Sequence, residues 1–313
     1  MPRSKTKRPR TPSPPADRRA PASTTPSPQR AKKLKLLAAH TLESPFPDFH
    51  RPTPLEAADV LAILSRAHPD VAARRRAPSA RSNAAFTCGN VPDVLESLVG
   101  TVLSQNTSSR NAAAAKDGLD AAFGRNDFAA IAAAPRKAVV AAIRSGGLAN
   151  KKAGVVQNLL REVHARHGVY SLQHLTADVG FTDDAAMEEL VSYDGVGPKT
   201  ASCVLLFCLG RASFPVDTHV FRLSRLLQWV PPKSDRVTAQ AHLDLTIPDD
   251  LKYGLHQLMF THGKRCKGCK GPGMRDECVL KDWLREQKGV KEEEQELLLR
   301  KAEDEDEETV LPT

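Results

Sequence analysis

Aromatic side chains are scarce in this chain of 313 residues, in which phenylalanine, tyrosine and tryptophan together make up 5%. Long hydrophobic runs are missing, and no apolar stretch approaches the roughly 20 residues that a membrane-spanning helix needs. The first residues, from Met1 to Lys5, lack the hydrophobic segment of a secretory signal peptide. Six cysteines without such a signal favour a reducing compartment. We therefore expect no membrane partner.

The chain also lacks the alternation of polar and apolar residues that marks half-buried strands, and it contains no internal repeat. The many alanines and few aromatics predict an all-α protein instead. Apolar spacing places helices at about 93–103, 111–123, 135–144, 150–167 and 248–262. Thr53, Pro54 and Glu56 form a helix start, with threonine as N-cap and proline at the first position. A net charge of +8 gives mild support for a nucleic-acid partner.

Both ends of the chain are too polar to build a core. Residues 1–50 are rich in proline, serine, lysine and arginine, and we predict a disordered basic tail. Its basic clusters at 7–10 and 32–35 are either import signals, DNA-binding arms or merely solvated. We predict a nuclear protein, with the mitochondrion as a second compartment. Residues 289–313 form an acidic tail, which leaves 51–288 as the folded domain.

The segment from Tyr193 to Ala201 reads YDGVGPKTA and predicts a helix, a glycine hairpin and a second helix. Gly195 and Gly197 allow a tight turn, and Pro198 suits the first position of a helix. The hairpin N–H groups and the positive end of the second helix point the same way. Such an arrangement binds a nucleic-acid phosphate without using side chains.

Lys199 lies in the first turn of this second helix, where the helix dipole disfavours a cation. Partial burial adds to that effect, so we expect a neutral amine to be accessible near pH 7, as a nucleophilic lysine requires. The alternative is that Lys199 simply contacts a phosphate.

Asp217 precedes an amphipathic helix that carries Val220, Leu223 and Leu227 on one face. A plain N-cap is the simplest role for this carboxylate. The cap is compatible with a catalytic role, because a carboxylate held rigidly is what electrostatic catalysis needs.

These two segments resemble the endonuclease III family of DNA glycosylases, in which roughly LPGVGxKTA is followed by VDTH[IV]xR. Here the second element is VDTHVFR, from Val216 to Arg222. Tyr193 and Asp194 stand where the family usually has Leu-Pro. The resemblance implies a two-lobed, all-α HhH-GPD fold with a bundle lobe at about 88–210. It implies a second lobe from about 51–87 and 211–288, a cleft for a flipped nucleotide between the lobes, and a monomer.

The resemblance extends to three further segments. The run from Leu103 to Asn111 resembles the family's LSQNT segment, so Gln105 or Asn106 would fill the gap left by a flipped nucleotide; the alternative is that both cap helices. Lys152, in a segment that resembles the family's glycine turn, is expected at the surface or on a phosphate. His219 either orients the site or has a packing or capping role. The expected DNA contacts are Gln105, Asn106, Gly195, Val196, Gly197, Thr200, His219 and Lys152.

The cysteines depart from the family. Its members often hold a [4Fe-4S] cluster with C-x6-C-x2-C-x5-C, whereas Cys266, Cys269 and Cys278 form only C-x2-C-x8-C. A cubane cluster normally needs four thiolates. Three alternatives stay open: no metal, a degenerate [4Fe-4S] cluster, and a zinc site completed by His262.

The function implied by the resemblance is base-excision repair of double-stranded DNA. Lys199 would attack the sugar and release a damaged base, usually an oxidised pyrimidine, and its Schiff base would permit β-elimination with Asp217 assisting. The alternatives are a glycosylase for mismatched thymine, uracil or 5-methylcytosine, a helix-hairpin-helix module without catalysis, and an RNA-binding helix-hairpin-helix protein.

Overall fold

The computed structural model describes residues 43–71, 76–176, 180–270 and 277–289. Within these ranges the chain is helical and has no strand. The main helices are α2 (Pro54–Ala67), α3 (Val94–Ser104), α4 (Ser109–Phe123), α5 (Phe128–Ala133), α6 (Arg136–Ala142), α7 (Ala149–His167), α8 (Asp183–Ser192), α9 (Pro198–Cys203), α10 (Thr218–Leu226), α11 (Arg236–Thr246) and α12 (Asp249–Arg265). None of the described helices is both long enough and apolar enough to cross a bilayer. Most of the two predicted tails lies outside the described residues.

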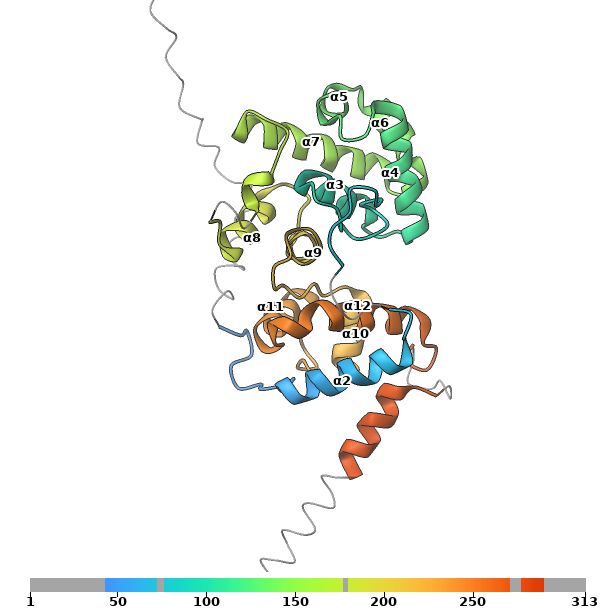
Figure 1. Cartoon of the computed structure of the whole chain (residues 1–313), viewed down its shortest axis with the longest axis vertical. Helices are drawn as coiled ribbons and strands as arrows, with labels where there is room; N and C mark the ends of the chain where they lie inside the picture. The colour runs from blue at the N-terminus through green and yellow to red at the C-terminus, as the bar shows by residue number, and fades with distance from the viewer. Residues whose placement is uncertain (1–42, 72–75, 177–179, 271–276, 290–313) are drawn as a thin grey trace, which may run out of the picture.

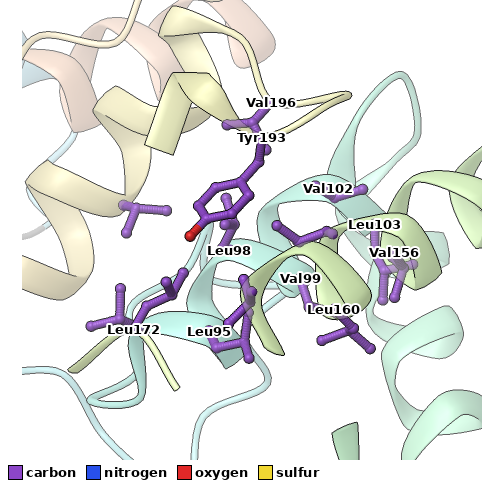
Figure 2. Close-up of a cluster of buried hydrophobic side chains, with 14 of the residues drawn as sticks. Leu95, Leu98, Val99, Val102, Leu103, Val156, Leu160, Leu172, Tyr193 and Val196 are labelled. Atoms are coloured by element: carbon purple, nitrogen blue, oxygen red, sulfur yellow. The ribbon is translucent and has the colours of Figure 1, made fainter. Parts of the chain in front are cut away.

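The bundle lobe is built around α3, which packs against α4, α7 and α9 and lies among the upper helices of Figure 1. Ten of its eleven residues are buried, from Val94 to Leu103. Figure 2 shows the ring of Tyr193 inserted beside Leu95 and Leu98. The hydroxyl of Tyr193 donates to Glu189 at 3.0 Å. Tyrosine therefore fills the place of the family's leucine, since its ring is apolar and its polar end has a partner.

The second lobe joins the start of the ordered chain to its end. Helix α12 packs against α2 and α10, and a separate core gathers apolar side chains from α2, α10, α11, α12 and the helix at 279–289. Helix α2 begins with the expected capping box, in which Thr53 and Glu56 each bind the other's backbone N–H. These bonds satisfy two otherwise unpaired donors.

Helix α9 lies between the two groups of helices (Figure 1). It does not run on as a regular α-helix, because Val204–Leu209 form a π-helical turn, η4. A small cluster formed by Cys203, Leu206, Phe207 and Tyr253 ties this segment to α12. π-Turns often occur at functional sites, and this one lies directly after the hairpin.

Three helices of the described residues were not expected from the sequence, namely α5, α11 and the helix at 279–289. Helix α5 has six residues, too few to show a clear apolar period. Helix α11 starts with a capping box between Asp235 and Thr238, a local signal that would have revealed it. The other helices agree with the expected ranges to within a few residues.

Candidate functional site

The hairpin turn contains two glycines with different roles. The N–H of Val196 donates to the carbonyl of Tyr193 at 3.2 Å, which closes a turn. Gly195 has a φ of +85°, and a Cβ there would lie 2.4 Å from Val155 Cγ1. Gly197 has no atom within 4 Å of the corresponding position. Gly195 is therefore required by the protein itself, whereas the space in front of Gly197 is open to a partner.

Not all of the expected hairpin contacts are exposed. Val196 is completely buried and Thr200 is 4% exposed, so neither side chain is available to DNA. Gly197 is the N-cap of α9 and provides no side-chain cap. The first N–H groups of a helix lack partners within it, so the backbone between Gly197 and Lys199 is the part of the hairpin that suits an anion.

Lys199 is half-buried in the first turn of α9, and its pKa is raised rather than lowered. Negative charge on Cys203 contributes most to this increase, followed by Cys88 and Asp217, while burial acts in the opposite direction. Burial also raises the pKa of Cys203 to about 12. Cys203 is therefore a thiol at neutral pH, where the Asp217 carboxylate favours the ammonium form of Lys199 and burial opposes it. Whether the neutral amine is accessible therefore depends on the balance between burial and this carboxylate, a partner that the sequence alone does not place.

Asp217 is both the N-cap of α10 and a neighbour of Lys199. Its Oδ1 accepts from the N–H groups of His219 and Val220 at 2.9 and 2.7 Å. Its charge acts on both Lys199 and His256. The cap fixes the carboxylate, and the fixed carboxylate supplies negative charge beside the lysine, so the two roles coexist.

His256 is a member of this site that sequence reasoning missed. It lies on α12, is 5% exposed, and donates from Nδ1 to the carbonyl of Pro215 at 2.9 Å. Burial lowers its pKa to about 4, with Asp217 acting in the opposite direction and Lys199 in the same one. At neutral pH its Nε2 therefore carries a free electron pair beside a cation and a carboxylate. The sequence showed only a histidine on the apolar face of a helix, which usually indicates packing.

The two wedge candidates differ in their surroundings. Gln105 is half-buried, and its Nε2 donates to Thr200 Oγ1 at 3.1 Å and to the carbonyl of Gly195 at 3.5 Å. Asn106 is exposed and has a left-handed backbone with a φ of +50°. Gln105 thus connects the end of α3 to the hairpin, while the amide of Asn106 is accessible.

Lys152 is not at the surface, contrary to expectation. It is 3% exposed, and its Nζ donates to the carbonyls of Leu103 and Gly146 at 2.7 and 2.8 Å. Burial lowers its pKa. Lys152 therefore supports the end of α3, where the wedge candidates begin, and is not available to a phosphate.

His219 and Arg222 join α10 to α12. A Cβ at Gly263 would lie 2.8 Å from the Cβ of His219, and Arg222 Nη2 donates to the carbonyl of Gly263 at 2.7 Å. The ring of His219 also packs edge-on against Phe260. His219 is thus held by packing, which was one of its two expected roles, and the glycine after His262 is what permits this close approach.

A second constellation lies at the end of α12. His262, Cys266, Cys269 and Cys278 come together, with one donor atom from each lying within 4.8 Å of all the others. Cys88 and Cys208 are not part of this group. Among the described residues of this lobe, these four form the group that suits a metal.

Comparisons with known proteins agree with this geometry. The model of the HhH-GPD superfamily of base excision DNA repair proteins matches residues 99–248. A protein of Arabidopsis thaliana named as a DNA glycosylase is 39% identical over 243 residues, covering 72% of this chain and 81% of that protein. Endonuclease III of Sulfolobus acidocaldarius is 26% identical over 201 residues, which cover 64% of this chain and 85% of that protein. A solved endonuclease III–DNA complex has a TM-score of 0.56 at 22% identity, covering 73% of this chain and 94% of that one, and supports the fold. The chain therefore belongs to the HhH-GPD superfamily of base excision DNA repair proteins, as a DNA glycosylase of that family.

Proposed function

We propose that this glycosylase is also an AP lyase that acts on damaged double-stranded DNA through a Schiff base on Lys199. The observation that carries the proposal is the electrostatic coupling of Lys199 to Asp217 directly after the glycine hairpin. Binding of DNA alone requires neither side chain. A lysine and a carboxylate held beside a phosphate-binding turn are suited to attack on a sugar.

In the proposed complex, the backbone around Gly197 binds a phosphate of the lesion strand. Asn106 enters the duplex where the target nucleotide has left, because it is exposed at the end of α3. Gln105 holds the wedge segment to the hairpin through Thr200. The side chain of Gln105 thus couples extrusion of the nucleotide to binding of the phosphate at the hairpin.

Lys199 attacks as the free amine, so its ammonium form must lose a proton during the reaction. Positive charge develops on the deoxyribose as its bond to the base breaks, and Asp217 stabilises it. The same positive charge lowers the pKa of the Lys199 ammonium, so that its proton passes to the departing base. The base leaves with the electron pair of the glycosidic bond and with this proton, and the free amine forms the new bond to C1′.

The lyase step follows from the covalent intermediate. Cleavage of the C1′–O4′ bond opens the sugar, and O4′ takes a proton from the nitrogen as the adduct becomes a protonated Schiff base. The Schiff base makes the C2′ proton acidic. Removal of that proton expels the 3′ phosphate with the electron pair of its bond to C3′, and water later releases the lysine. His256 is neutral at physiological pH, because its pKa is about 4. It therefore adds no second cation to compete with Lys199 for the Asp217 carboxylate.

We infer oxidised pyrimidines as the substrate class from the resemblance to endonuclease III. The test is a panel of duplexes that carry thymine glycol, a mismatched thymine, uracil or 5-methylcytosine, each incubated with borohydride. We expect thymine glycol to give the most trapped protein–DNA adduct, and Lys199→Ala to give none. Adducts that survive in Lys199→Ala would place the nucleophile elsewhere, and preference for another duplex would change the substrate class but keep the mechanism.

A further inference from the structure

The side chains at the end of α12 form a compact group of metal-binding atoms. Cys269 Sγ lies 3.1 Å from Cys278 Sγ and 3.1 Å from His262 Nε2. Cys278 Sγ lies 3.6 Å from the same nitrogen. Cys266 Sγ is within 4.8 Å of all of these. His262, Cys269 and Cys278 are each less than a tenth exposed, so the donor atoms converge in an interior position.

This group is too small for the cluster that the family often carries. In a cubane each thiolate binds a different iron, so the ligand sulfurs are separated by two Fe–S bonds and an edge of the cluster, roughly 6 Å. The donor atoms here all lie within 4.8 Å of one another. One donor is also an imidazole in place of the fourth thiolate. The residues present therefore do not fit a [4Fe-4S] cluster.

A single tetrahedral ion comes much closer to this spacing than a cubane does, and it fits the chemistry of the four donors. Zinc binds sulfur at about 2.3 Å and imidazole nitrogen at about 2.1 Å, which separates ligand atoms by roughly 3.5 to 4 Å. Three thiolates and one histidine are one of the usual ligand sets of structural zinc. We propose that His262, Cys266, Cys269 and Cys278 bind one zinc ion in place of the iron–sulfur cluster.

The surroundings of His262 provide independent support. Its Nε2 faces the two sulfurs, and its Nδ1 lies 2.9 Å from Nε2 of His68. A histidine that binds a metal through one ring nitrogen characteristically donates its other N–H to a nearby acceptor, which fixes the ring. His68, the C-cap of α2, is placed to be that acceptor.

The ion would fasten three parts of the second lobe together. His262 and Cys266 come from the end of α12, and Cys278 directly precedes the helix at 279–289. His68 adds the end of α2. All four positions around the ion are filled by protein, so the site holds no place for a substrate or water, and its role is structural.

The test is the metal content of the full-length protein, expressed with both iron and zinc in the medium. We expect one zinc per chain by mass spectrometry, no acid-labile sulfide, and no iron–sulfur absorbance in the visible range. Cobalt exchanged into the wild-type protein should give the charge-transfer and d–d bands of a tetrahedral thiolate site. Iron with labile sulfide, a metal-free protein, or a Cys269–Cys278 disulfide would each overturn the proposal.

Substitutions at two of the ligands and at a buried control thiol distinguish loss of zinc binding from loss of folding. Cys278→Ser and His262→Ala should lose zinc, whereas Cys208→Ser, a buried thiol of the bundle lobe, should keep it. His262→Cys should retain one zinc, because four thiolates also suit the ion. His68→Ala should keep the ligands but bind zinc roughly 10- to 100-fold more weakly in competition with a chromophoric chelator. Full zinc in His262→Ala would exclude the histidine as a ligand.

Discussion

The ammonium group of Lys199 and the carboxylate of Asp217 attract each other across the junction between the two lobes. Each residue stands at the beginning of a helix, Lys199 in the first turn of α9 and Asp217 at the N-cap of α10. The short segment between η4 and α10 brings these two helix starts together. The pair is thus placed by backbone elements whose own ends are fixed by Gly197 and by the Asp217 cap.

Asp217→Asn tests the charge separately from the cap. Asparagine is as good an N-cap as aspartate, so α10 should stay capped and the helical content by circular dichroism should not change. Base release in single turnover should slow by at least ~100-fold, in the range of a lost electrostatic contact, while DNA affinity stays nearly unchanged. A rate within a few-fold of wild type would remove Asp217 from the reaction.

The two hairpin glycines should respond differently to substitution. Gly197→Val has open space, so the variant should fold normally and bind every duplex sequence more weakly, because phosphate contacts carry no sequence information. In Gly195→Ala the new Cβ would collide with Val155, and alanine would have to adopt a positive φ. This variant should therefore lose more than about 1 kcal/mol of unfolding free energy. Thermal denaturation and a binding series on two unrelated duplexes would distinguish them. Equal affinity for DNA in Gly197→Val would refute the open phosphate site.

Asn106→Ala and Gln105→Ala should distinguish the residue that inserts into the duplex from the residue that links the wedge segment to the hairpin. With 2-aminopurine next to the lesion, Asn106→Ala should give a smaller fluorescence rise, because less of the nucleotide is held outside the duplex. Gln105→Ala should retain the rise at saturating protein but need more protein to reach it, since it loses the bond to Thr200. The reverse pattern would make Gln105 the wedge.

Lys152→Met tests whether this lysine is structural. The variant leaves the carbonyls of Leu103 and Gly146 without their donor, which should cost about 2 to 3 kcal/mol of unfolding free energy in urea titration. The slope of log affinity against log salt should stay unchanged, whereas a phosphate-binding lysine would reduce it by about 1. A smaller slope with normal stability would restore the surface contact that the sequence suggested.

Acid should destabilise the protein through His256. Its pKa is about 4 in the folded state and about 6.5 when unfolded. The unfolded chain therefore binds more protons between these values. The contribution of neutral His256 to the unfolding free energy is fully present above pH 6.5 and is lost as the pH falls towards 4. Its upper limit is about 3 kcal/mol. His242, whose pKa is also lowered by burial, acts in the same direction.

His256→Asn is the matched variant, since its side-chain amide can still donate to Pro215 but does not titrate. Its unfolding free energy should fall less than that of wild type between pH 6.5 and 4. Urea titrations at several pH values measure this difference. Parallel pH curves for the two proteins would mean that the pKa of His256 is not lowered.

Local signals in the sequence determined much of this protein. The capping box at Thr53, the turn at Gly195 and the N-cap at Asp217 each depend on residues within one helical turn, so their chemistry can be read directly from neighbouring letters. The apolar period of α3 likewise indicated that it would be central. The match of two such segments to a known pattern then indicated the family.

Tertiary structure alone decided which charged groups surround Lys199, the burial of Lys152, and the grouping of His262 with three cysteines. It also placed His256, from α12, beside a lysine and a carboxylate from two other helices. Each of these depends on which distant segments pack together, and on how much water that packing removes. Desolvation and Coulombic attraction act through space, so spacing along the chain carries no information about them.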